Sequence, residues 1–148
     1  MRRTSQRNAG LKHGWRSGLE ELIAEQLKGL GAKYRFEALV VPFIQPVKPR
    51  RYTPDFFLSN GIIIETKGRF VTADRQKHKL VKEQHPDLDI RFVFSNSKQR
   101  ISKQSKTTYA AWCQTFGFKY ADKLVPTSWV YEVNEKSLAA IRALKETA

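Results

Sequence analysis

The feature that most limits how this chain can fold is the stretch from Arg51 to Lys67. It contains three consecutive isoleucines, and side chains on a strand alternate between the two faces of a sheet. The run therefore predicts a strand that is covered on both faces. Residues 59–61, Ser-Asn-Gly, are typical of a hairpin turn, and they predict that strand Arg51–Leu58 pairs with strand Ile62–Lys67. A buried strand then ends in two charged residues on one face, Glu65 and Lys67.

A second carboxylate lies across this predicted hairpin, because Pro54 and Asp55 precede the turn. Asp55 could come within reach of Glu65. Mg²⁺ typically binds one or two protein carboxylates together with waters and a phosphate, and a nearby ammonium group such as that of Lys67 can orient water or stabilise charge on a phosphate. The spacing alone is equally compatible with an Asp in a turn and a Glu-Lys pair on a solvated strand.

The charge of the chain points to a polyanionic partner. Its 148 residues contain 27 Lys and Arg against 14 Asp and Glu, which gives a net charge of +13. Nucleic acid is the commonest partner of such a protein. A membrane surface is the rival, but the sequence shows no basic amphipathic helix with a broad aromatic face and no apolar run near the ~18 residues of a membrane span. We expect no membrane segment and no signal peptide.

The length fits one domain with a modest core, so residues 1–148 are predicted to form a single domain. The one cysteine, Cys113, cannot form an internal disulfide, which is compatible with a reducing cytosol. Residues 1–16 carry five basic residues and no acid, and they lack apolar periodicity. They predict a mobile basic arm that could close on DNA, although an ordinary frayed terminus explains them equally well.

The first predicted helix begins with Ser17 as N-cap and ends near Gly29 and Gly31. Glu20 follows Ser17 by three residues, as in a capping box. Capping alone therefore explains Glu20 and favours a structural role. The residue also lies beside the apolar stripe of the helix, so it could face a cleft as a third carboxylate.

A strand is predicted over Tyr34–Ile44, broken by Pro42. The next segment, 45–50, contains Pro46 and Pro49 and predicts a stiff, extended connector. Such a connector disfavours folding back and encourages exchange of strands between two chains. A plain surface loop is the alternative.

The downstream pattern predicts further helices and strands. A helix over Val71–His85 with Thr72 as N-cap carries many basic residues and faces either solvent or DNA. His78 on that helix is interpreted as a phosphate contact or a bystander. The other expected elements are a strand at 90–94, a basic loop at 97–106, a helix at 108–116 with a core-facing aromatic stripe, a connector at 126–133 and a helix at 136–145.

Pro54-Asp55 followed by Glu65-x-Lys67 resembles the PD-(D/E)xK signature of the restriction-endonuclease-like nucleases. Longer strings are more specific, namely RSGLE at 16–20, YTPDF at 52–56, GIIIETKG at 61–68 and EQHPDLDIRFVFS at 83–95. With their nearly constant spacing from about Arg16 to Trp129, these strings resemble the phage endonuclease I family, the four-way-junction resolvases of the T-odd phages. The residues before and after this stretch match poorly, and nothing is carried over to them.

This resemblance implies an α/β fold with a restriction-endonuclease-like mixed central sheet flanked by helices, in a strand-exchanged homodimer joined through the bridge at 45–50. It implies the catalytic set Glu20, Asp55, Glu65 and Lys67. It also implies two Mg²⁺ or Mn²⁺ ions per site, held by Asp55, Glu65, the Thr66 carbonyl and Glu20. Each site would combine Glu20 of one chain with the other residues of its partner, which reverses the interpretation of Glu20 from capping alone.

The implied function is a structure-selective DNA endonuclease that resolves four-way (Holliday) junctions and branched DNA. Metal-dependent phosphodiester hydrolysis would leave 5′-phosphate ends, in the cytoplasm of a phage-infected bacterial host. Two alternatives stay open. A sequence-specific restriction-type nuclease would need side chains that read base edges, and a non-catalytic branched-DNA-binding protein would leave Asp55, Glu65 and Lys67 without a role.

Overall fold

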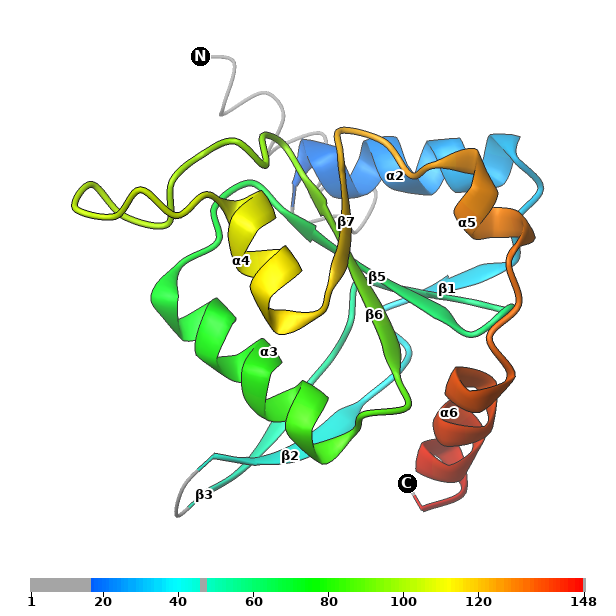
Figure 1. Ribbon diagram of the computed structural model, residues 1–148. Helices are drawn as coiled ribbons and strands as arrows, with labels where there is room; N and C mark the ends of the chain where they lie inside the picture. Colours follow the sequence, from blue (N-terminus) through cyan, green and yellow to red (C-terminus); the bar gives the residue numbers. More distant parts are fainter. Residues whose placement is uncertain (1–16, 46–47, 148) are drawn as a thin grey trace.

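The computed structural model describes residues 17–45 and 48–147 and shows a five-stranded sheet flanked by helices (Figure 1). The strands of this sheet, in spatial order, are β1 Tyr34–Phe36, β4 Phe56–Leu58, β5 Ile62–Lys67, β6 Asp89–Phe94 and β7 Lys119–Asp122. A separate two-stranded sheet consists of β2 Val41–Gln45 and β3 Lys48–Tyr52. The helices are α2 Gly18–Gly29, α3 Thr72–Gln84, α4 Tyr109–Phe116, α5 Thr127–Tyr131 and α6 Glu135–Thr147. The predicted mixed α/β architecture is confirmed.

The sheet is mixed because its connections are of two kinds. β4 and β5 form the predicted antiparallel hairpin, and β1 pairs antiparallel with β4. β5, β6 and β7 are parallel, with α3 and α4 as the crossover connections that parallel neighbours require. The expectation of one strand over Arg51–Leu58 is wrong, because the chain leaves the β2–β3 sheet after Tyr52 and enters the central sheet only at Phe56.

Both faces of the sheet are covered, as the isoleucine run predicts (Figure 1). Ile63 packs in the core on the side of α3 and α4, together with Phe92, Phe94 and Trp112. Ile62 and Ile64 pack on the other side, against the apolar faces of α2 and α5. Because side chains alternate along β5, Glu65 continues the face of Ile63. At the C-terminal end of β5, side chains from the helices on both faces of the sheet can therefore reach one site.

The chain turns sharply after β1. Glu37 has a positive φ of 48°, which is uncommon outside glycine and asparagine. This turn ends β1, so the single strand expected over Tyr34–Ile44 is wrong and is divided into β1 and β2. The backbone N–H of Glu37 donates to the carbonyl of Asp55 at 2.9 Å. The turn therefore ties the region after β1 to the region before β4.

The segment after β2 forms a hairpin. Gln45 pairs with Lys48 and Val41 with Tyr52, so β2 and β3 are antiparallel. The expectation that the prolines keep this segment from folding back is therefore wrong for the single chain, although Pro46 and Val47 themselves lie outside the described residues, as does the arm 1–16. The hairpin lies along α3, where the backbone of Ile44 exchanges two hydrogen bonds with the side chain of Gln84. The exchange of strands between two chains stays a prediction.

The helix ends follow local chemistry. Ser17 caps α2 by accepting a hydrogen bond from the N–H of Glu20, and Thr108 caps α4 in the same way, as predicted for the first helix. Thr72 does not cap α3, because its hydroxyl accepts from Arg75 and Val71 holds the N-cap position. The connector expected at 126–133 contains the short helix α5, whose Trp129 is buried. In the described part of the chain, no helix combines the length and the apolar character that a bilayer crossing needs.

Candidate active site

Asp55 and Glu65 lie side by side in the structure, as the hairpin predicts. Asp55 occupies the last position before β4, and its backbone N–H donates to Oε1 of Glu65 at 3.1 Å. The hydroxyl of Tyr52 donates to the same oxygen at 3.2 Å. Thr66 donates to Oδ2 of Asp55 from its N–H at 2.9 Å and from its hydroxyl at 2.7 Å. Both carboxylates are buried and held by several hydrogen bonds, which excludes an Asp and a Glu on a solvated strand face.

Lys67 lies at the edge of this carboxylate pair. Its Nζ is 3.6 Å from Oε2 of Glu65 and 3.3 Å from Oδ1 of Asp74, and 17% of its side chain is exposed. Asp74 comes from the first turn of α3, and the sequence analysis did not identify it as part of the site. The ammonium group is therefore fixed between two carboxylates while it keeps access to solvent, where a phosphate could approach.

Two further carboxylates reach Asp55 from the opposite side. One oxygen each of Glu20, Glu37 and Asp55 lie within 4.8 Å of one another. Glu20 projects from the first turn of α2 and is buried, so it faces the site while its backbone N–H serves the Ser17 cap. The sequence pattern does not reveal Glu37, because it lies within the strand predicted over Tyr34–Ile44 and upstream of the break at Pro42. The turn at its positive φ brings it beside Asp55.

The pKa values of the two central carboxylates are shifted in opposite directions. Burial and the neighbouring charge of Glu65 raise the pKa of Asp55 to about 7. Burial also opposes ionisation of Glu65, but its contacts with His78, Lys67 and the N–H of Asp55 outweigh it and lower its pKa below the usual value. Without a cation, the site therefore holds an ionised Glu65 beside an Asp55 that is only partly ionised near neutral pH.

His78 also belongs to this region, but not as a phosphate contact. Its side chain is completely buried, and Nε2 lies 3.7 Å from Oε2 of Glu65. Burial lowers its pKa below the usual value, so the ring is neutral. The interpretation of His78 as a residue that touches DNA is wrong, because no DNA phosphate can reach a fully buried ring.

The donor set fits a divalent cation. Three carboxylate oxygens within 4.8 Å of one another concentrate negative charge, and burial and the charge of Glu65 raise the pKa of Asp55. Hard cations such as Mg²⁺ and Mn²⁺ prefer oxygen ligands of this kind. The residues that could hold one or two such ions are Asp55, Glu20, Glu37, Glu65 and the carbonyl of Thr66.

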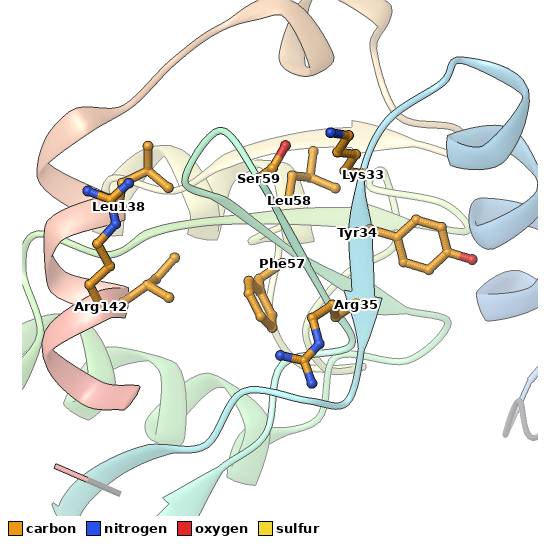
Figure 2. Close-up of a pocket in the computed structure, with 9 residues that line it drawn as sticks. Lys33, Tyr34, Arg35, Phe57, Leu58, Ser59, Leu138 and Arg142 are labelled. Carbon is orange, nitrogen blue, oxygen red and sulfur yellow. The ribbon is translucent and has the colours of Figure 1, made fainter. Parts of the chain in front are cut away.

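The acidic cluster is separate from a pocket of about 310 Å³ between β1 and α6 (Figure 2). That pocket has an apolar floor that includes Phe57 and Leu138, with the basic side chains of Lys33, Arg35 and Arg142 around it. None of the predicted site residues is among its described lining residues. The predicted site residues therefore lie at the end of β5 and outside this pocket.

Comparison with known proteins agrees with the site geometry. The sequence model of the family described as "Phage endonuclease I" matches residues 1–148. Endonuclease I of Escherichia phage T7 is 48% identical over 118 residues, which cover 80% of this chain and 79% of that protein. Endodeoxyribonuclease 1 of Enterobacteria phage T3 is also 48% identical over 118 residues, covering 80% of this chain and 78% of the T3 protein. With its whole length matched and its acidic residues gathered at one site, the chain belongs to the phage endonuclease I family.

Proposed function

We propose that this protein is a metal-dependent, structure-selective DNA endonuclease that resolves four-way junctions and branched DNA in the cytoplasm of the infected host. The observation that carries the proposal is the convergence of Glu20, Asp55, Glu65 and Lys67 at one end of β5. The names of the T7 and T3 relatives, an endonuclease and an endodeoxyribonuclease, support cleavage within DNA. The net charge of +13 supports a polyanionic substrate.

The cofactor we propose is Mg²⁺ or Mn²⁺, with two ions per site. Bound at these carboxylates, the ions would supply positive charge next to the scissile phosphate and acidify a water molecule. Asp55 is central to both positions, since it contacts the Glu65 side of the site through its N–H and the Glu20 side through its carboxylate. Glu65 and the Thr66 carbonyl would hold one ion, and Glu20 would support the other.

The remaining groups of the chain bind and orient the substrate. Lys67 donates to a phosphate oxygen or orients the attacking water, and its contact with Asp74 keeps the ammonium group in place. The basic arm 1–16 and the exposed basic residues of β3, namely Lys48, Arg50 and Arg51, supply charge against the DNA backbone. In-line attack of water on the phosphorus, with the P–O3′ bond broken and the 3′-oxygen leaving as a hydroxyl, would leave 5′-phosphate ends.

We further propose a homodimer with composite sites. Glu20 and Glu37 precede the tip of the β2–β3 hairpin in the chain, whereas Asp55, Glu65 and Lys67 follow it. If two chains open this hairpin and exchange the segments before it, every local contact is kept, but each site combines carboxylates of both chains. Two sites on a symmetric dimer can cut two opposed strands of a junction, which one site cannot do.

A cleavage assay tests the proposed function. We expect the protein to cut an immobile four-way junction in Mg²⁺, to leave a linear duplex with the same arms largely intact, and to stop cutting in EDTA. Asp55→Asn and Glu65→Gln should abolish cleavage while junction binding is kept. Asp87→Asn is the matched control, because Asp87 is exposed and precedes β6 at the opposite end of the sheet.

The two alternatives give other results. A restriction-type nuclease would cut the duplex at a fixed sequence, and a non-catalytic module would bind the junction without cutting it. Cleavage that persists in EDTA or in Asp55→Asn would refute the assignment of the site. Ligation of the products without prior phosphorylation would support the 5′-phosphate ends.

A further inference from the structure

His78 occupies the middle of α3 and lies within a cage of aromatic rings. Its ring centroid is 4.8 Å from that of Phe92 and 4.9 Å from that of Tyr52, and Phe70 and Phe118 lie 6.4 and 6.3 Å away. No part of the side chain is exposed. A phenylalanine would suit such surroundings without any polar atom to bury.

The two ring nitrogens make this position costly for a histidine. Among the residues that the structure describes, neither Nδ1 nor Nε2 has a hydrogen-bond partner. An unsatisfied buried polar group destabilises the folded state. Packing therefore does not account for the imidazole, and its surroundings should contain a group that it serves.

That group is the carboxylate of Glu65. Nε2 of His78 is 3.7 Å from Oε2, just beyond hydrogen-bond range, and hydrogen bonds of catalytic groups are often long before the substrate complex forms. The other oxygen, Oε1, already accepts from the N–H of Asp55 and the hydroxyl of Tyr52. Lys67 also lies near Oε2, but its ammonium group contacts Asp74 as well. His78 is thus placed to orient Oε2 from the protein interior.

We propose that His78 is a positioning residue that donates from Nε2 to Oε2 of Glu65 and fixes the orientation in which this carboxylate receives the divalent cation. The inference rests on the proposed function, and it gives His78 no contact with DNA. Partners that orient metal ligands in this way typically change metal affinity or activity by about 10–100-fold. A neutral imidazole supplies the one N–H that this role requires.

The test compares substitutions that separate hydrogen bonding from packing. His78→Phe removes the donor and keeps an aromatic ring in the cage, and His78→Leu is a smaller donor-free variant in case the phenylalanine is too large. His78→Gln restores an N–H donor. Phe118→Leu is the matched control, because Phe118 packs against the same ring and is buried to a similar degree without contacting Glu65 among the described interactions.

The first measurement is calorimetry of Mn²⁺ binding to the full-length protein without DNA. We expect His78→Phe to bind Mn²⁺ about 10–100-fold more weakly than wild type, and His78→Gln to recover part of that loss. The metal-free His78→Phe protein should be as stable as wild type or more stable, because two unsatisfied nitrogens are gone. Phe118→Leu should lose stability and keep its affinity for Mn²⁺.

The second measurement is junction cleavage at saturating DNA. The donor-free variants should show a lower maximal rate with unchanged junction binding in EDTA, because His78 acts on the carboxylate and not on the substrate. Wild-type Mn²⁺ affinity and cleavage rate in His78→Phe or His78→Leu would overturn the inference, and so would a glutamine variant that recovers nothing. If the wild type itself shows no metal-dependent cleavage, the proposed function fails instead.

Discussion

Asp55 and Glu65 are neighbours in one buried site, yet their surroundings shift their pKa values in opposite directions. Burial disfavours the charge of Glu65, but His78, Lys67 and the N–H of Asp55 outweigh burial and lower its pKa. Asp55 receives two hydrogen bonds from Thr66, but burial and the charge of Glu65 prevail and raise its pKa to about 7. Binding of a cation at such a site would release the proton that the raised pKa of Asp55 retains.

This pKa predicts that Asp55→Asn stabilises the metal-free protein at neutral pH. Between about pH 4 and pH 7 the folded state keeps a proton that the unfolded chain has released, so the wild type loses stability as the pH rises. With about 1.4 kcal/mol per pKa unit, the rise from 3.8 to about 7 costs up to about 4 kcal/mol. The difference in free energy of unfolding between variant and wild type, measured with denaturant in EDTA, should therefore grow over this range and level off above it. A difference that does not change with pH would contradict the prediction.

We expect substitution of Glu37 to show that its carboxylate takes part in metal binding. Its carboxylate lies with those of Glu20 and Asp55, so Glu37→Gln should weaken Mn²⁺ binding and slow junction cleavage by about tenfold. The change is isosteric and leaves the same backbone conformation at φ 48°. Glu25→Gln on the exposed face of α2 makes the same change in charge and should have no effect. Equal Mn²⁺ affinities for the two variants would remove Glu37 from the site.

At the scale of elements, the sequence was sufficient where local chemistry decides the structure. The isoleucine run predicts a strand and Ser17 predicts a helix start, and the structure confirms both. The errors lie where distant contacts decide. No local sequence pattern predicts that the chain turns at Glu37 toward Asp55. Nor does one predict that the side chain of Gln84 bonds to β2 and favours a hairpin. Asp74 and Glu37 were missed for the same reason, because no fixed spacing links them to the motif.

The turn between β4 and β5 supports the sheet at the start of β5, and Gly61 is the critical residue of this turn. Gly61 has a φ of 94°, and an added Cβ would lie 2.5 Å from the carbonyl oxygen of Asn134, at the start of α6. Gly61→Ala should therefore lower the free energy of unfolding by at least about 2 kcal/mol. Gly29→Ala is the control, because no described atom lies within 4 Å of the position that its Cβ would take and alanine favours a helix. Chemical denaturation measures both, and equal stability of the two variants would refute the role of the turn.

At the scale of the whole molecule, composite sites make a prediction that a mixed dimer can test. A heterodimer of a Glu20→Ala chain and an Asp55→Ala chain is made by co-expression, since exchanged chains should separate slowly. If sites are shared, one site receives both substitutions, and the other receives wild-type Glu20 and Asp55. This heterodimer should nick one strand of a junction, although each mutant homodimer is inactive. A verified heterodimer that cuts nothing would show that each site is built within one chain, and the metal chemistry would be unaffected.

The tip of the β2–β3 hairpin also divides the chain in a way that invites engineering. A polypeptide interrupted between Gln45 and Lys48 yields one fragment with Glu20 and Glu37 and another with Asp55, Glu65 and Lys67. Neither fragment carries a full set of carboxylates, and the first fragment contributes α2, whose apolar face the second fragment needs to cover Ile62 and Ile64. Reassociation of the fragments would bury that face and rebuild the acidic cluster at the same time. The hairpin is thus the natural division for a split nuclease whose DNA cleavage reports that two fused partners have met.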